Sequence, residues 1–158
     1  VGVSTGAPYR HFATLESFIA AIATIGLREL TAAMREASHE VAASEDEKLA
    51  AIGAAYVRYA QEHPRLYEAM FYFRSSQLAT YPELAGVASE AFSVVREAVA
   101  AVQATRDTAA VDAHCAAVGA WALVHGFSLL TNDGLIEQTE GPESTLAERV
   151  TRLLLTGL

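Results

Sequence analysis

Hydrophobic residues recur at helical spacing along most of the chain. Between residues 14 and 38 the apolar positions Phe18, Ile22, Ile25, Leu30 and Met34 follow one another every three to five residues, as on the buried face of an α-helix. No segment shows the strict alternation of apolar and polar residues that predicts a strand. The pattern therefore predicts an all-α fold, a helical bundle.

Capping and breaking residues divide this pattern into separate helices. Thr14 is a suitable N-cap for the first, and Ser44-Glu45-Asp46-Glu47 has the form of a capping box. The second helix should end at His63, because a residue that precedes proline avoids helical angles. Further helices are predicted from Pro64 to Phe73, from Pro82 to Val102, from about Asp107 to Asn132 and from Gly141 onward.

The segment 113–132 contains no Asp, Glu, Lys or Arg. Its length is about that of a membrane-spanning helix. However, it contains His114, His125 and Asn132, and it is flanked by Asp112 and Asp133. A helix that is buried on all sides in a protein, or in an interface, has the same composition. We therefore predict a buried helix and no membrane partner.

The formal net charge of −8 is unevenly distributed. Residues 1–38 carry three arginines and three glutamates, which cancel, so the whole negative charge lies in residues 39–158. An acidic surface repels phosphate groups. Any contact with DNA is therefore expected within residues 1–38.

The single cysteine, Cys115, excludes an internal disulfide and fits a reducing compartment such as the cytoplasm. We predict that it is a small buried apolar residue rather than a nucleophile, because no activating pair lies near it. His114 and His125 would lie about 16 Å apart along a helix, too far to share one metal ion. No metal or other cofactor is expected, and no phosphate loop or nucleophile elbow indicates an enzyme.

The opening residues 1–12 predict a tight turn at Gly2 followed by a short helix that Ser4 caps. The pattern Gly2-Val3-Ser4-x-Gly6-x-x-Tyr9-x-His11-Phe12 resembles the recognition-helix motif of the TetR family of bacterial transcription regulators. In that family two helices precede the motif. The resemblance thus implies that this chain is part of a longer protein.

Two further motifs are similar to the C-terminal domain of a TetR subgroup named after its Trp-His-Gly signature. They are Glu62-His63-Pro64-x-Leu66-Tyr67 and Trp121-Ala122-Leu123-Val124-His125-Gly126. The resemblance implies two parts. Residues 1–38 would be the C-terminal part of a helix-turn-helix DNA-binding domain with its connecting helix. Residues 39–158 would be the effector-binding and dimerisation domain.

The same resemblance assigns roles to individual residues. Base edges in the major groove would face Thr5, Gly6, Ala7 and Pro8, whereas phosphates would be bound by Ser4, Tyr9 and His11. A pocket for an apolar or aromatic effector would be formed by Tyr56, Tyr59, Tyr67, Met70, Phe71, Phe73, Phe92, Trp121 and His125. The dimer interface would contain Gly119, Ala120, Gly126, Leu146, Val150, Leu153 and Leu154.

Each assignment has a simpler alternative. Tyr9 and His11 would serve equally as surface residues of a helical corner, and the aromatic set and Trp121 as filled core. His125 falls on one helical stripe with His114, Val118, Trp121 and Leu129, and would equally be a satisfied core histidine. The expected function is a homodimeric, ligand-responsive repressor that binds a double-stranded DNA operator. The alternative is a helical carrier of small molecules without a DNA role.

Overall fold

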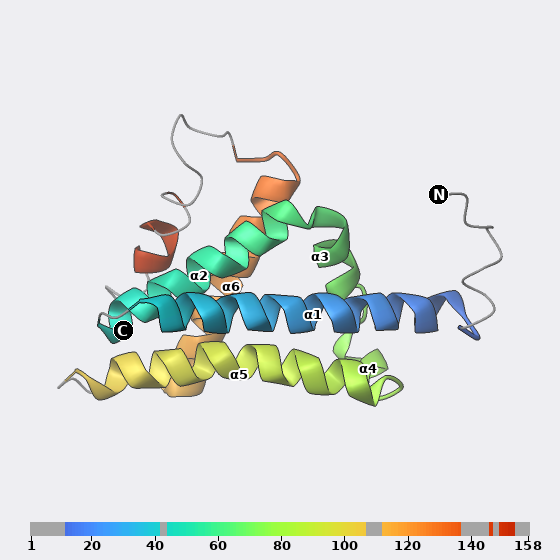
Figure 1. Ribbon diagram of the computed structural model, residues 1–158, viewed down its shortest axis with the longest axis horizontal. Helices are drawn as coiled ribbons and strands as arrows, with labels where there is room; N and C mark the ends of the chain where they lie inside the picture. Colours follow the sequence, from blue (N-terminus) through green and yellow to red (C-terminus); the bar gives the residue numbers. More distant parts are fainter. Residues whose placement is uncertain (1–11, 42–43, 107–111, 137–145, 147–148, 154–158) are drawn as a thin grey trace.

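The computed structural model describes residues 12–41, 44–106, 112–136, 146 and 149–153 (Figure 1). Within these ranges the chain forms helices and no strand, which confirms the predicted all-α fold. The helices are α1 (Leu15–Glu40), α2 (Glu45–Glu62), α3 (Pro64–Met70), α4 (Ser75–Leu78), α5 (Pro82–Ala104) and α6 (Ala113–Asn132). Leu146 and residues 149–153 are also helical.

Local signals account for the starts of α1 and α2. Thr14 accepts a hydrogen bond from the backbone N–H of Ser17, whose hydroxyl lies 3.1 Å from the Thr14 nitrogen. Ser44 and Glu47 form the predicted capping box, with the Ser44 N–H donating to the Glu47 carboxylate. Pro64 and Pro82 occupy the first turns of α3 and α5. These predicted starts are confirmed.

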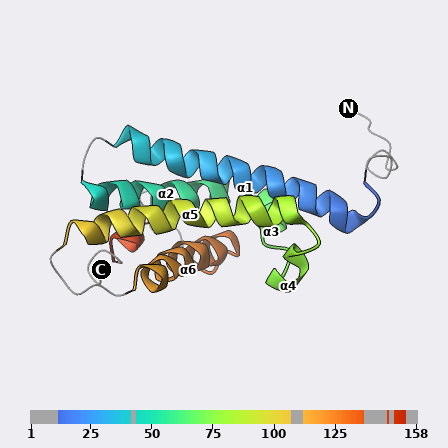
Figure 2. The same cartoon turned by 90° about the horizontal axis from the view of Figure 1, so that it is seen from below.

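The long helices pack side by side around one core (Figures 1 and 2). α1 and α5 run parallel, α2 runs antiparallel to both, and α6 lies against α5 and α2 away from α1. Two ion pairs join α1 to α5, Arg28–Glu83 at 2.7 Å and Arg35–Glu90 at 2.8 Å. Because all four side chains are about half exposed or more, burial of the apolar faces stabilises this packing more than the ion pairs do.

α6 differs from its prediction in two respects. It begins at Ala113 with Asp112 as N-cap rather than near Asp107; residues 107–111 lie outside the described ranges. It is also buried on one face only: Val118, Leu129 and Leu130 are each at least 40% exposed. Among the described residues an apolar face of α6 remains uncovered, so the prediction of a helix buried on all sides inside one subunit is wrong, whereas burial of that face in an interface stays a prediction.

Cys115 is exposed, so its predicted burial is also wrong. It lies in the first turn of α6, where Ala116 and Ala117 take the inward positions. The helix from Pro64 is shorter than predicted, because it ends at Met70 and leaves Phe71 and Phe73 in the connection to α4.

By length and composition alone, α1 and α6 could each cross a membrane. This observation is weak, because the core helix of a soluble protein satisfies the same criterion. α1 buries Ala23, Leu27, Leu30 and Met34 against the rest of the bundle. Its apolar face is therefore already occupied by protein.

Candidate ligand-binding site

A largely apolar cavity of about 230 Å³ lies between α1, α3, α5 and α6. Among the described residues, no charged side chain lines it. Its walls are formed by Leu27, Leu30, Met34, Tyr56, Met70, Phe71, Phe73, Ser75, Leu78, Leu84, Ala88, Ala91, Phe92, Val95 and Trp121. A space of this kind suits a small molecule that is itself mostly apolar.

One end of the cavity adjoins four hydrogen-bonded side chains, here called the polar cluster: Tyr56, Tyr67, Trp121 and His125. The two tyrosine oxygens lie 3.0 Å apart. His125 Nδ1 lies 2.6 Å from the Tyr67 oxygen and 3.0 Å from that of Tyr56. The Trp121 Nε1–H donates to the Tyr56 oxygen at 3.4 Å. The cluster thus joins α2, α3 and α6 at one point.

A single direction of donation gives a partner to the Trp121 Nε1–H, to both tyrosine hydroxyls and to His125 Nδ1. Trp121 donates to Tyr56, Tyr56 donates to Tyr67, and Tyr67 donates to His125 Nδ1. This direction requires His125 to be neutral with its proton on Nε2. These four polar atoms therefore pair with one another, and the adjoining cavity surface stays mostly apolar.

Burial keeps the polar cluster uncharged. It lowers the pKa of His125 below its ordinary value, because the imidazolium form is penalised away from water. Burial likewise raises the pKa of Tyr56 to about 12 and raises that of Tyr67 further. The cluster therefore provides neither a charged anchor for a ligand nor a tyrosinate or imidazolium for catalysis near neutral pH.

Aromatic rings extend from the polar cluster along the cavity wall. Phe71 makes an edge-to-face contact with His125 at 4.4 Å between ring centres and another with Tyr67 at 5.1 Å. Phe92 contacts Trp121 at 5.9 Å. These rings prefer edge-to-face contacts with one another, and they offer the same geometry to an aromatic ligand.

The structure brings together most of the predicted pocket residues. Tyr56, Met70, Phe71, Phe73, Phe92 and Trp121 line the cavity. Tyr67 and His125 lie behind this wall: Tyr67 accepts a hydrogen bond from Tyr56 and donates one to His125. Tyr59 is placed elsewhere: its hydroxyl donates to Glu29 of α1 at 2.9 Å, and its ring contacts His63. Tyr59 therefore links α1 to α2 and does not line the cavity.

Sequence reasoning missed the contribution of α1. Leu27, Leu30 and Met34 form part of the cavity wall. The helical spacing of Leu30 and Met34 indicated a buried face, but periodicity alone does not separate packed core from the wall of a cavity. α1, which the family resemblance predicts to be the connecting helix, is consequently a direct wall of the cavity.

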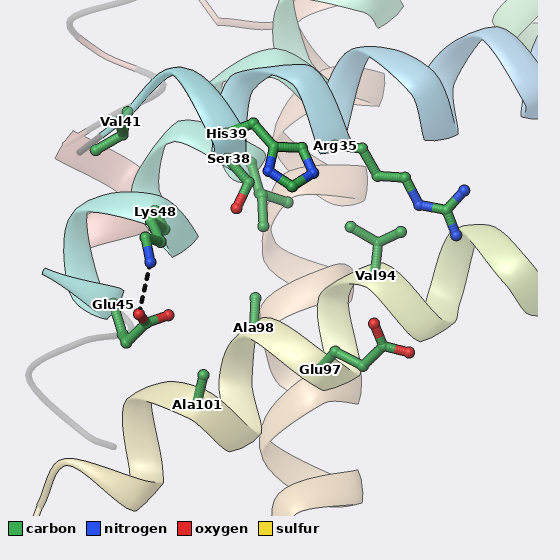
Figure 3. A pocket seen from close by; sticks show the side chains of 11 residues that line it. Arg35, Ser38, His39, Val41, Glu45, Lys48, Val94, Glu97, Ala98 and Ala101 are labelled. Atoms are coloured by element: carbon green, nitrogen blue, oxygen red, sulfur yellow. Dashed lines mark hydrogen bonds and ion pairs between the residues drawn. The ribbon is translucent and has the colours of Figure 1, made fainter. Parts of the chain in front are cut away.

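A second hollow of about 560 Å³ lies between the end of α1, the start of α2 and α5 (Figure 3). It is an open groove with a floor of small apolar residues such as Val94 and Ala98. Charged groups of both signs line it, and Lys48 and Glu45 pair with each other at 2.7 Å. The groove lacks the enclosed aromatic wall of the cavity among its described residues, so the cavity is the better candidate site.

The predicted interface residues differ in burial. Ala120 is 4% exposed inside the bundle, so the structure does not support its place in an interface. Leu146 and Val150 are half-buried against the core, whereas Leu153 is 66% exposed. A Cβ added at Gly119 or Gly126 would meet no described atom within 4 Å. Leu154 lies outside the described residues, as do the predicted DNA contacts between Ser4 and His11.

Residues 49–154 match the family described as tetracyclin repressor-like, C-terminal domain. The chain belongs to the TetR family. This match covers the helices that carry the polar cluster and most of the cavity wall. No curated protein sequence matches the chain.

Three solved structures resemble this TetR-family chain in fold. A protein of unknown function from Rhodococcus sp. RHA1 has a TM-score of 0.81 and 26% identity, covering 99% of this chain and 79% of that one. A TetR family transcriptional regulator from Thermus thermophilus has a TM-score of 0.73 and 21% identity, with coverages of 99% and 84%. A bacterial regulatory protein of the TetR family from Rhodococcus RHA1 has a TM-score of 0.75 and 20% identity, with coverages of 98% and 79%.

Proposed function

We propose that this protein is a ligand-responsive transcriptional regulator, acting as a homodimeric repressor in the bacterial cytoplasm rather than as an enzyme. The observation that carries the proposal is a partly enclosed apolar cavity with α1 as one wall, in a chain of the TetR family. Residues 1–38 belong to the DNA-binding head and its connecting helix, and residues 39–158 bind the effector and the second subunit.

The effector is a small uncharged molecule that is apolar or aromatic. Within the described part of the chain, the cavity wall contains no Asp, Glu, Lys, Arg or His that would offset the desolvation of a charged ligand. Among these wall residues, only Ser75 and the cluster members Tyr56 and Trp121 have polar side-chain atoms. Shape and burial of apolar surface would therefore determine affinity.

The second subunit covers the exposed apolar face of α6. Val118, Leu129 and Leu130 lie on this helix, and Leu153 of the helical residues 149–153 is exposed as well. If a two-fold axis passed beside this face, the α6 helices of the two subunits would pack on each other and bury the same residues from both. Gly119 and Gly126 would permit close approach of the two helices.

DNA binding is assigned to the recognition-helix motif on the resemblance of Gly2 to Phe12. Two such helices in a dimer would reach successive major grooves about 34–36 Å apart. Ligand binding releases DNA only to the extent that the ligand binds the released conformation more tightly. In this proposal α1 carries the change, because it lines the cavity and leads toward the motif.

A gel-shift titration of the full-length protein on DNA from beside its own gene tests the regulator against the carrier alternative. We expect binding that weakens as salt increases, and a Tyr9→Ala variant that binds less tightly with an unchanged melting temperature. Absence of binding at every salt concentration would favour the carrier. A large loss of stability in Tyr9→Ala would place Tyr9 in the core.

A further inference from the structure

α3 packs on α1 without clearance at Gly26. A Cβ placed on Gly26 would lie 2.8 Å from both Cγ and Sδ of Met70 and 2.9 Å from Cγ of Leu66. Carbon atoms at ordinary contact are about 3.5–4.0 Å apart, so a larger side chain at this position would force the neighbours to shift. Leu66 and Met70 are four residues apart on α3, and they therefore flank Gly26 on one face of that helix.

Met70 contributes both to the cavity wall and to the contact between α3 and α1. Its side chain lines the cavity and also contacts the backbone surface of α1 at Gly26. Methionine is flexible and usually absorbs a displacement by changing rotamer. Here Met70 is only 5% exposed and is confined against Gly26, so little free space remains on that side.

We propose that the Met70–Gly26 contact transmits occupancy of the cavity to α1. An occupant that displaces Met70 toward α1 has to displace α1 as well, because no gap separates them. This inference rests on the proposed function, which makes the cavity the effector site and α1 the connecting helix. Met70 and Gly26 are thus positioning residues that act through α1.

The geometry also contains a competing route. Leu27, Leu30 and Met34 project from α1 into the cavity wall, and a ligand touching them would act on α1 directly. The two routes make different predictions for variants at Met70. Shortening Met70 removes the proposed contact and leaves the three α1 wall residues in place.

The test uses 1-bromohexane as an uncharged probe. The chain has a single tryptophan, Trp121, in the cavity wall, so a bound bromine atom should quench the protein's tryptophan emission. Matched titration with 1-chlorohexane controls for effects other than heavy-atom quenching. Hydrogen exchange of residues 15–25, followed by mass spectrometry, reports on α1 between Gly26 and the head.

In the unmodified protein we expect saturating probe to raise the exchange rate of residues 15–25 at least twofold. Met70→Ala should still bind the probe but lose this response, and the conservative Met70→Leu should retain it. Leu78→Ala is the matched control, because Leu78 lines the cavity and is not among the atoms nearest to a Cβ at Gly26. It should keep the response.

Gly26→Ala provides a test without ligand. The added methyl group should push Met70 toward the cavity, raise exchange of residues 15–25 in the absence of probe and weaken probe binding at least fivefold. Gly86→Ala in α5 gains the same helix propensity, but its methyl group meets no described atom within 4 Å. It should change neither quantity, and Gly26→Ala/Met70→Ala should recover probe binding.

The outcomes separate the two proposals. If the probe binds and Met70→Ala responds like the unmodified protein, the α1 wall residues carry the signal and this inference is overturned alone. If the probe binds without changing residues 15–25, the inference is likewise wrong while the cavity remains a binding site. If the probe does not quench Trp121 in the unmodified protein, the effector site and this inference both fail.

Discussion

Tyr67 tests the polar cluster at the level of one hydroxyl group. The side chain is 1% exposed, and its oxygen contacts both Tyr56 and His125. Tyr67→Phe should lower the free energy of unfolding by about 1–2 kcal/mol, because two buried polar groups lose a partner. Urea denaturation measures this loss, with Tyr72→Phe on the exposed surface as control. Equal values for the two variants would show that the cluster adds nothing to stability.

His125 makes stability depend on pH in a predictable direction. Its folded-state pKa is lowered by burial, so between that value and the ordinary value of about 6.5 the unfolded chain binds more protons. The stabilisation is complete above pH 6.5 and is lost as the pH falls toward the folded-state pKa. Melting temperatures measured from about pH 8 to about pH 5 should therefore fall less steeply in His125→Gln. Parallel curves would contradict a buried neutral imidazole.

Residue identity alone predicted part of this chemistry. The aromatic residues, Trp121 and His125 were recognisable as a group, because they stand out in an alanine-rich and leucine-rich chain and match a family motif. The sequence did not distinguish Tyr59 from the pocket residues; its hydrogen bond to Glu29 in the structure does. The contact of Met70 with Gly26 joins residues 44 positions apart. No local pattern encodes such a contact.

At the scale of elements, local signals placed helix starts more reliably than helix ends and faces. Thr14, Ser44 and the two prolines act within one turn, so their effect could be read directly from the sequence. The end of α3 at Met70 and the exposed face of α6 depend on which helices pack nearby. The apolar composition of α6 predicted that the helix would be buried, but it did not indicate which helices or which subunit would cover each face.

The connection 71–81, which contains α4, is the cavity wall with the least support. No residue of α4 is buried, although Phe73, Ser75 and Leu78 all face the cavity. Segments with few buried contacts open at low free-energy cost. We therefore expect Phe73→Ala to accelerate both association and dissociation of 1-bromohexane, measured by stopped-flow emission of Trp121. The exposed Thr80→Ala is the control, and a change in dissociation alone would make Phe73 an ordinary wall contact.

For the whole molecule, the distribution of charge and of exposed apolar surface restricts where the proposed partners, DNA and a second subunit, could bind. The net charge of −8 falls outside residues 1–38, so in the proposed regulator the acidic body would repel DNA while residues 1–38 approach it. Within residues 39–158, the exposed face of α6 is the apolar surface that is proposed to contact the second subunit. α6 lies on the side of the bundle away from α1 (Figure 2), so in the proposed dimer, pairing through its exposed face would leave α1 free to move.

The assembly is tested by placing a charge on that face. Light scattering at micromolar concentration should give twice the 16.8 kDa of the chain. Leu129→Asp introduces two carboxylates into a symmetric interface, at about 3 kcal/mol or more in total, which raises the dimer dissociation constant by more than about a hundredfold. Leu15→Glu alters a leucine on α1 that is still more exposed than Leu129 and should leave the dimer intact. If Leu129→Asp remained a dimer and Leu15→Glu did not, the interface would lie on α1 rather than on α6. Pairing would then hold α1 in place, which contradicts the proposal that α1 moves when the ligand releases DNA.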